Sequence, residues 1–347
     1  MKKLCALALL SASPVLAQEA VEPVTPASVV ASAPASDWHA IHPADLLVMT
    51  LEPDRDGKPR QVVIQLMPPP FSQGWVGNVR TLAKAHWWDG TTVYRVVDNW
   101  VAQWGDGEDD EAKAKPLPEG LRVVPESEYV VAVGSNAHDM LELTVARSYI
   151  SRLPADHQAA LLDEAGDLIP SQREGFLQAY LGPTVIGLPD NYSAGTGFLF
   201  GWPIASSESG VWPVHCYSHV GVARDLSPNT GTGAELYAVI GHAPRQLDRN
   251  IAVVGRVIEG IEHLSTLPRG KGDAGVYDDV ALRVPIVSVR LGNEVEEFPQ
   301  PHFEHLDGNS FAQYVQVRAN RNDPFYKVAA GGVDVCNVQV PIRRVPG

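Results

Sequence analysis

A fourteen-residue stretch, VYRVVDNWVAQWGD, constrains the fold of this chain more than any other segment. It occupies residues 93–106 and reads as two short strands, because β-branched and aromatic residues are frequent in both halves. Arg95 lies five residues before Trp100 and eight residues before Gln103. The stretch therefore places a permanently charged guanidinium, a large aromatic ring and an amide side chain at fixed offsets.

The composition is that of a soluble globular protein with an acidic balance. The chain has 347 residues, of which 45% are apolar and 20% charged, enough for one large domain or two modest ones. It carries 41 acidic against 27 basic residues, for a net charge of −14. Because no Lys/Arg-rich run occurs, a nucleic-acid partner and binding to an anionic membrane surface are both disfavoured.

The N-terminal segment predicts export. Residues 1–17 read MKKLCALALLSASPVLA, a signal peptide in which two lysines precede a short apolar run and small residues end it. The run is too short to span a bilayer. Residues 18–36 are rich in Pro, Ala and Ser, which predicts a flexible linker. We therefore expect a protein that is secreted across the inner membrane and located in the periplasm.

The pattern from residue 37 to residue 292 predicts a mainly β domain. Short apolar runs predict eight strands and helical spacing predicts two helices. This content suits a closed eight-stranded antiparallel barrel capped by two helices. The predicted strands are 46–52, 60–66, 93–97, 100–106, 218–225, 234–241, 251–257 and 284–292, and the predicted helices are 72–86 and 259–267.

Three segments, in sequence order, carry a resemblance to a known family. Residues 93–106 resemble the active-site signature of the cyclophilin-type peptidyl-prolyl isomerases, in which an Arg, a Phe and a Gln hold the same offsets. Residues 223–241 and 247–264 together form a second block, similar to two later cyclophilin segments, and residues 76–97 are a weaker third match. The resemblance implies a cyclophilin-like barrel and isomerisation of X-Pro bonds.

The resemblance also implies a site. Arg95 matches the catalytic cation and Gln103 the residue that orients it, whereas an isolated strand arginine is more often part of a surface ion pair. For Leu247, ordinary barrel core is an equally good interpretation. The substrate-binding positions implied by the match are Trp100, Val101, Ala223, Glu235, Tyr237, Leu247 and Ile251.

Several positions differ from the family pattern. Glu235 stands where the family has Gln, and a carboxylate there could pair with Arg95 and either hold or divert it. Gln246 replaces a Trp that many members use to bind cyclosporin, so we expect weak cyclosporin binding. Ile251 replaces a His that lies over the bound proline. These changes motivate an alternative function, a low-activity peptide-binding or chaperone module whose insert carries the partner site.

The implied reaction requires no cofactor. Resonance gives the peptide C–N bond a rotational barrier of roughly 18–20 kcal/mol, and X-Pro bonds exchange slowly between their two isomers. When the amide twists, the prolyl nitrogen gains a lone pair, which a positioned cation such as Arg95 can stabilise. The expected partners are Pro-containing segments of unfolded or flexible proteins, and no nucleophile, metal or cofactor is needed.

Two regions lie outside the family pattern. Residues 107–215 form a large insert, for which we predict a strand pair at 121–134 and helices at 137–153, 156–166 and 170–180, hence a mixed, partly helical subdomain. Residues 293–347 form a C-terminal extension. Within it, 314–319 and 335–342 alternate like strands.

The sequence also bears on whether the chain has a disulfide and whether it has a metal site. Cys216 and Cys336 remain after the signal peptide, either as a disulfide or as two buried thiols. The sequence HCYSH at 215–219 does not match a common zinc spacing, and the acidic run 105–113 lacks the calcium-loop pattern. The Gly-rich run 229–235 does not connect a strand to a helix, so a phosphate cradle is disfavoured. We therefore predict no metal site.

Overall fold

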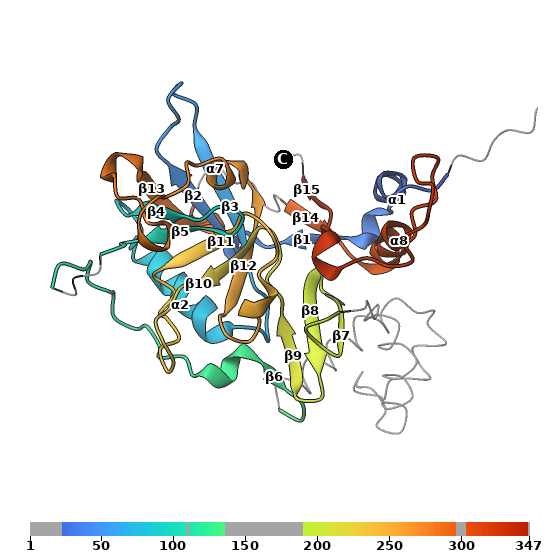
Figure 1. The fold of residues 1–347 in the computed structure, drawn as a ribbon, viewed down its shortest axis with the longest axis horizontal. Coiled ribbons are helices and arrows are strands. Elements are labelled where there is room, and N and C mark those ends of the chain that lie inside the picture. The colour runs from blue at the N-terminus through green and yellow to red at the C-terminus, as the bar shows by residue number, and fades with distance from the viewer. Residues whose placement is uncertain (1–22, 109, 111, 136–189, 296–302, 346–347) are drawn as a thin grey trace, which may run out of the picture.

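The main element of the fold is a closed antiparallel barrel, which lies to the left in Figure 1. The structure is a computed structural model that describes residues 23–108, 110, 112–135, 190–295 and 303–345. The predicted fold class is confirmed, since each predicted barrel strand overlaps an observed one. In order around the barrel the strands are β10 (His219–Val222), β11 (Leu236–Val239), β5 (Val101–Gly105), β4 (Thr92–Val96), β13 (Val284–Leu291), β2 (Leu46–Leu51), β3 (Arg60–Leu66) and β12 (Val253–Glu259).

Strand alternation divides the barrel side chains between an inner core and an outer surface. On β11, Leu236 and Ala238 are buried in the main core, whereas Tyr237 and Val239 belong to a separate apolar cluster. Successive side chains of a strand point to opposite faces, so one strand serves both purposes. The outward-facing side chains of β4, β5, β10 and β11 are therefore not part of the barrel core and are available to form a site.

The two predicted helices are present, with different lengths. Helix α2 (Gln73–Lys84) lies within the predicted range 72–86 and buries Trp75, Val79 and Leu82 in the main core. The indole N–H of Trp75 donates to the backbone oxygen of Thr230 at 3.0 Å, which satisfies its one polar atom. Helix α7 (Glu262–Ser265) is a single turn, shorter than the range predicted for it.

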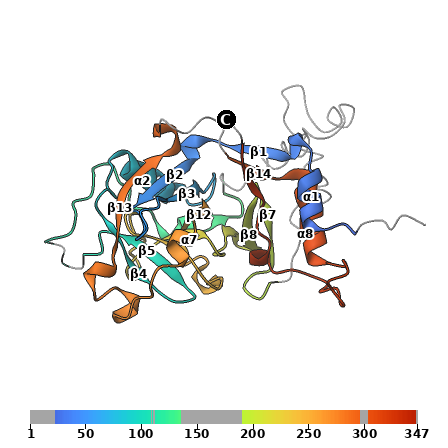
Figure 2. The same cartoon turned by 90° about the horizontal axis from the view of Figure 1, so that it is seen from above.

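The N-terminal and C-terminal segments come together beside the barrel. Strands β1 (Trp38–Ile41), β14 (Phe303–Leu306) and β15 (Ile342–Arg344) form a three-stranded sheet. Helix α1 (Pro26–Ser32) lies against helix α8 (Gly308–Ala319), as both views show (Figures 1 and 2). Val29, Phe311 and Val315 are buried in a second core there.

Three expectations about the terminal segments need correction. Residues 314–319, predicted as a strand, lie in α8, because Phe311, Tyr314 and Val315 together form a buried helical face that a six-residue window does not reveal. The predicted strand 335–342 is mostly irregular, and β15 begins only at Ile342. Within the predicted flexible linker 18–36, residues 26–32 form α1, capped by Thr25.

The described part of the insert adds a four-stranded sheet. Its strands, in order, are β6 (Val131–Ala132), β9 (Gly210–Pro213), β8 (Trp202–Ser207) and β7 (Gly195–Leu199). The predicted strand pair at 121–134 is wrong, because Glu126–Tyr129 form a 3₁₀ turn and only two residues pair in β6. The predicted helices 137–153, 156–166 and 170–180 lie outside the described residues, as does the predicted signal peptide 1–17.

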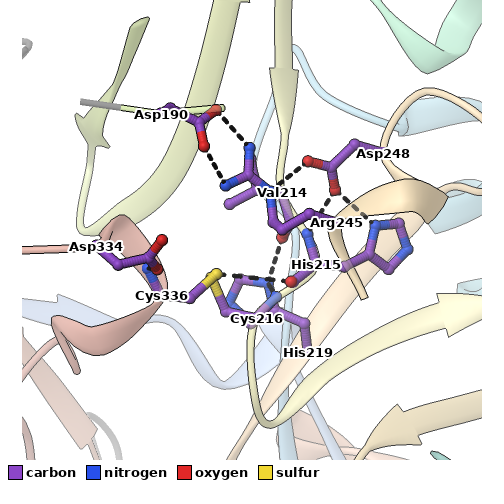
Figure 3. Close-up of a disulfide and its surroundings, with 9 residues drawn as sticks. All are labelled: Asp190, Val214, His215, Cys216, His219, Arg245, Asp248, Asp334 and Cys336. Atoms are coloured by element: carbon purple, nitrogen blue, oxygen red, sulfur yellow. Dashed lines mark hydrogen bonds and ion pairs between the residues drawn. A yellow bond between two sulfur atoms is a disulfide. The ribbon is translucent and has the colours of Figure 1, made fainter. Parts of the chain in front are cut away.

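A disulfide joins the barrel to the C-terminal extension. Cys216, just before β10, is bonded to Cys336, which lies 120 residues later in the 3₁₀ turn Val335–Asn337 (Figure 3). Of the two possibilities that the sequence left open, the structure therefore shows the bonded pair.

In the part of the chain that the structure describes, no helix is both long enough and apolar enough to cross a bilayer.

Reducing this disulfide is expected to destabilise the protein. A cross-link that closes a loop of about 100 residues lowers the entropy of the unfolded chain by an amount worth about 3–5 kcal/mol. Guanidinium unfolding with and without reductant measures the difference. A double variant with both Cys216→Ser and Cys336→Ser is the control, because reductant should not change its midpoint. Identical midpoints for the oxidised and reduced wild type would contradict the expectation.

Candidate active site

The barrel register brings four positions into one row. Arg95 on β4 pairs with Gln103 on β5, Gln103 pairs with Tyr237 on β11, and Tyr237 pairs with Gly221 on β10. Directly opposed residues of neighbouring strands point to the same face of a sheet. The row therefore gathers Arg95, Gln103 and Tyr237 on the outer face, although they are up to 142 residues apart in the sequence.

Arg95 is held in a defined orientation. Its Nη1 donates to Gln103 Oε1 at 2.7 Å and its Nε donates to the backbone oxygen of Ala274 at 2.6 Å. The guanidinium carbon lies 5.3 Å from the ring centre of Trp100, within the range of a cation–π contact. Burial lowers the pKa of Arg95 from its ordinary value. A guanidinium nevertheless stays protonated at neutral pH.

A β-bulge adds Tyr94 to the same face. The β4–β5 register shifts between Val93 and Arg95, so Tyr94 and Arg95 both lie opposite Gln103. The amide Nε2 of Gln103 donates to the hydroxyl of Tyr94, and that hydroxyl donates to Glu235 Oε2 at 2.8 Å. Burial, reinforced by the charge of Glu235, raises the pKa of Tyr94 and keeps its hydroxyl protonated.

Glu235 is the far end of this hydrogen-bond chain. Its Oε1 accepts the backbone N–H groups of Asp106 at 2.8 Å and of Gly107 at 3.4 Å. Burial raises the pKa of Glu235. Among the described contacts Glu235 forms no ion pair with Arg95, so the direct pairing that we considered from the sequence is not seen. Instead, Gln103 and Tyr94 separate the two charges.

The carboxylate of Glu235 depends on a glycine beside it. A Cβ atom at Gly105 would lie 2.2 Å from Glu235 Oε2, and the backbone there has φ +149°. Any side chain at this position would displace the carboxylate and break its contact with Tyr94. Gly105 therefore makes room for the acid within the outer face.

All six apolar residues proposed for the pocket lie in one small cluster on the outer face. The cluster is separate from the barrel core, so for Leu247 the core interpretation does not hold. The ring of Tyr237 can pack against strand β10 because the residue opposite it there, Gly221, has no side chain. A Cβ atom at Gly221 would lie 2.3 Å from the phenolic oxygen of Tyr237. The cluster comprises buried Val101, Tyr237 and Val239 with partly buried Val97, Trp100, Ala223, Leu247 and Ile251.

A cavity of about 470 Å³ adjoins this cluster. Gln103, Ala223 and Glu235 line it together with Arg122 of the insert. The backbone of Arg122 is anchored to α2, since Asn78 accepts from its N–H at 2.8 Å and donates to its carbonyl at 2.9 Å. The insert therefore contributes part of the wall beside the predicted site.

The HCYSH segment has structural partners. His215 lies beside Asp248 and Tyr237, at 3.0 Å from each, and His219 donates from Nδ1 to the backbone oxygen of Val214 at 2.6 Å. Cys216 is in the disulfide. Within residues 23–108, 110, 112–135, 190–295 and 303–345, no three His, Cys, Asp or Glu side chains are grouped to hold a metal ion.

Comparison with known proteins identifies the family of this chain. The family model described as "Cyclophilin type peptidyl-prolyl cis-trans isomerase/CLD" matches residues 74–291. The chain belongs to the cyclophilin family. The match covers most of the chain, including the insert, and includes every residue that the sequence assigned to the site. By family, the protein is a peptidyl-prolyl cis-trans isomerase.

One solved cyclophilin structure supports the fold. The crystal structure of cyclophilin AquaCyp293 from Hirschia baltica matches with a TM-score of 0.53 and 20% identity, over 93% of this chain and 98% of that chain. A cyclophilin-type isomerase from Cryptosporidium parvum matches with a TM-score of 0.34 and 11% identity, over 71% of this chain and 96% of that chain. The comparison with curated proteins gives no match.

Restoring the family's glutamine at position 235 is expected to impair this cyclophilin. Both carboxylate oxygens of Glu235 accept hydrogen bonds, so a Gln would direct an N–H₂ donor at either Tyr94 or the backbone amides. Such a mismatch costs about 1–3 kcal/mol. We expect Glu235→Gln to lower both the unfolding midpoint and the isomerase rate.

Denaturant unfolding and a peptide isomerase assay measure these two effects. The exposed Glu262→Gln is a matched control that should change neither quantity. A sharp rise in isomerase rate for Glu235→Gln would contradict the expectation. It would mean that the acid restrains the catalyst instead of organising it.

Stability should also fall in acid because of His219. Burial lowers the pKa of His219 from 6.5 to about 3. Between these values the unfolded chain binds a proton that the folded chain does not, so stability is lost as the pH falls from about 6.5 toward about 3. The slope for one such group is at most about 1.4 kcal/mol per pH unit.

Unfolding free energies measured across this pH window test the contribution of His219. A His219→Asn variant should show a shallower dependence, although buried His305, with a pKa also near 3, retains its own share. Equal slopes for the wild type and the variant would show that His219 does not contribute.

Proposed function

We propose that this cyclophilin isomerises X-Pro bonds of exported proteins, and that Arg95 assists the twisting of the amide without a covalent intermediate. The observation that supports this most is the position of Arg95. A half-buried guanidinium, fixed by Gln103 and Ala274, stands at the edge of an apolar cluster with an aromatic floor. This arrangement combines an oriented cation with a surface that suits a pyrrolidine ring.

Arg95 has donors left for a substrate. A guanidinium carries five N–H groups, and among the described residues Gln103 and Ala274 accept one each, which leaves three without an acceptor in that part of the chain. No carboxylate forms an ion pair with Arg95 among the described residues, so its charge is not locally neutralised. When the amide twists, the prolyl nitrogen becomes a better acceptor, and a donor placed beforehand stabilises this state more than the planar one.

The apolar cluster supplies the binding surface for the proline ring. Tyr237 and Val101 are buried beneath it, and Trp100 and Leu247 lie at its margins. These side chains bury a ring mainly by removing apolar surface from water. The 470 Å³ cavity beside Gln103 and Ala223 extends the surface available to residues next to the proline.

Two features support the proposal that the substrate proteins are found in an oxidising compartment. The sequence predicts a signal peptide at residues 1–17, and disulfides such as Cys216–Cys336 persist mainly in secreted and periplasmic proteins. We infer that the clients are Pro-containing segments of unfolded or flexible exported proteins. Gln246, where many members have Trp, is exposed, which supports weak cyclosporin binding.

Removing the guanidinium is the direct test of the mechanism. We expect Arg95→Ala to lower the isomerisation rate of an X-Pro peptide by about 10²–10³-fold, the usual effect of losing a transition-state donor. Arg95→Lys keeps the charge but cannot bond Gln103 and Ala274 together, so it should recover only part of the rate. A protease-coupled assay measures the rate, and thermal unfolding controls for folding.

The same assay separates the isomerase from a peptide-binding or chaperone module. Equal rates for wild type and Arg95→Ala would refute the proposed mechanism. Binding of the peptide without any acceleration by the wild type would favour the module that binds and does not turn over.

A further inference from the structure

A line of buried polar side chains runs behind the apolar cluster. Arg245 donates to both carboxylate oxygens of Asp190 at 3.0 Å and, from Nε, to Asp248 at 2.6 Å. Asp248 lies 3.0 Å from His215 Nδ1, and His215 Nε2 lies 3.0 Å from the hydroxyl of Tyr237. Figure 3 shows Asp190, Arg245, Asp248 and His215 in this order. The line ends at the floor of the proposed proline pocket.

These groups are almost completely shielded from water. The side chain of His215 is 0% exposed, and those of Asp190, Arg245 and Asp248 are 3–5% exposed. Placing charges in such a setting gives little net stability, because desolvation offsets most of the attraction. A gain in stability therefore does not explain why these charged groups are buried. Their hydrogen-bond geometry suggests a different role, which is to fix the positions of neighbouring side chains.

The hydrogen-bond directions along the line are fixed. Asp248 Oδ1 accepts from the backbone N–H of His215 at 2.9 Å as well as from its ring, and Oδ2 accepts from Arg245. A carboxylate only accepts, so Nδ1 of His215 carries the proton, and in the neutral imidazole Nε2 is left as an acceptor. Burial, together with the charge of Asp248, raises the pKa of Tyr237, so its hydroxyl stays protonated and donates.

The line also connects two residues of the apolar cluster, Tyr237 and Leu247. Asp248 directly follows Leu247, which belongs to the apolar cluster, and Tyr237 reaches the cluster from β11. His215 lies between them, bonded to Asp248 on one side and to Tyr237 on the other. A shift of the Leu247 turn or of the Tyr237 ring would break a buried hydrogen bond, which is costly in a shielded setting.

We propose that His215, oriented by Asp248 and Arg245, is a positioning residue that sets the separation of Tyr237 and Leu247 and thereby the affinity of the pocket for proline. The inference rests on the proposed function, because it assigns a role within that site. His215 lies behind Tyr237 and acts through it, so it governs binding of the ring. Arg95, which contacts the Trp100 ring of the cluster, governs the rotation.

A double-variant cycle tests this coupling. Tyr237→Phe removes one hydroxyl and keeps the ring, His215→Phe removes both ring hydrogen bonds, and the double variant replaces both partners by apolar rings. The double variant also keeps the protein testable if His215→Phe alone folds poorly, since exchanging both partners of a bond for apolar groups is better tolerated than stranding one.

Nuclear magnetic resonance titration of an Ala-Pro-containing peptide gives the dissociation constant, and exchange spectroscopy gives the isomerisation rate of bound peptide. We expect each single variant to weaken binding about 5-fold and the double variant to weaken it no further, because the second change removes a bond already lost. The bound-state rate should stay within about 2-fold of the wild type, as expected for residues that act on binding.

Two controls separate this inference from its premise. Tyr314→Phe removes the hydroxyl of a second-core residue that donates to the backbone oxygen of Gln339, and it should leave peptide binding unchanged. Arg95→Ala should bind peptide and lose exchange; if exchange persists, the proposed function fails. Multiplicative losses in the double variant, or unchanged binding in Tyr237→Phe, would overturn the role of His215 while leaving that of Arg95 intact.

Discussion

The antiparallel register of β4, β5 and β11 is the constraint on which the site depends. It sets Arg95 opposite Gln103 and Gln103 opposite Tyr237, so three chemically different groups meet on one face. A slip of one residue in either pairing would send these side chains into the barrel and the core residues into water. The apolar interior therefore protects the arrangement outside it, because the same alternation serves both.

The outer face keeps its charges apart by hydrogen bonding. Gln103 and Tyr94 lie between Arg95 and Glu235 in a chain of hydrogen bonds. Gln103 accepts from Arg95 and donates to Tyr94, and Tyr94 donates to Glu235. The acid can then order the β5 loop through backbone amides while the cation keeps its charge for a ligand. The family residue at this position is neutral, and the structure shows how an acid is accommodated: Gly105 leaves room for it.

The sequence was sufficient to predict the barrel, because the alternation of apolar residues in strands is a local property of the chain, and the resemblance to the cyclophilins supplied most of the apolar cluster. It was not sufficient for Tyr94, since regular alternation places adjacent residues on opposite faces and the bulge that reverses this depends on pairing with β5. For His215 the sequence only disfavoured a role as a metal ligand, and it could not reveal the partners Asp248 and Tyr237, which are more than 20 residues away. Helix α8 was missed because six residues carry too little periodicity to separate a helix from a strand.

The disulfide has a consequence for where this molecule could be divided. The covalent ring between Cys216 and Cys336 contains four of the eight barrel strands, from β10 to β13, together with β14 and α8. A fragment trimmed to the barrel alone would end before Cys336 and leave Cys216 as a lone thiol beside His215. Such a fragment would be open to mispairing with other chains, so the minimal unit that folds without a stray sulfhydryl extends past the barrel to residue 336.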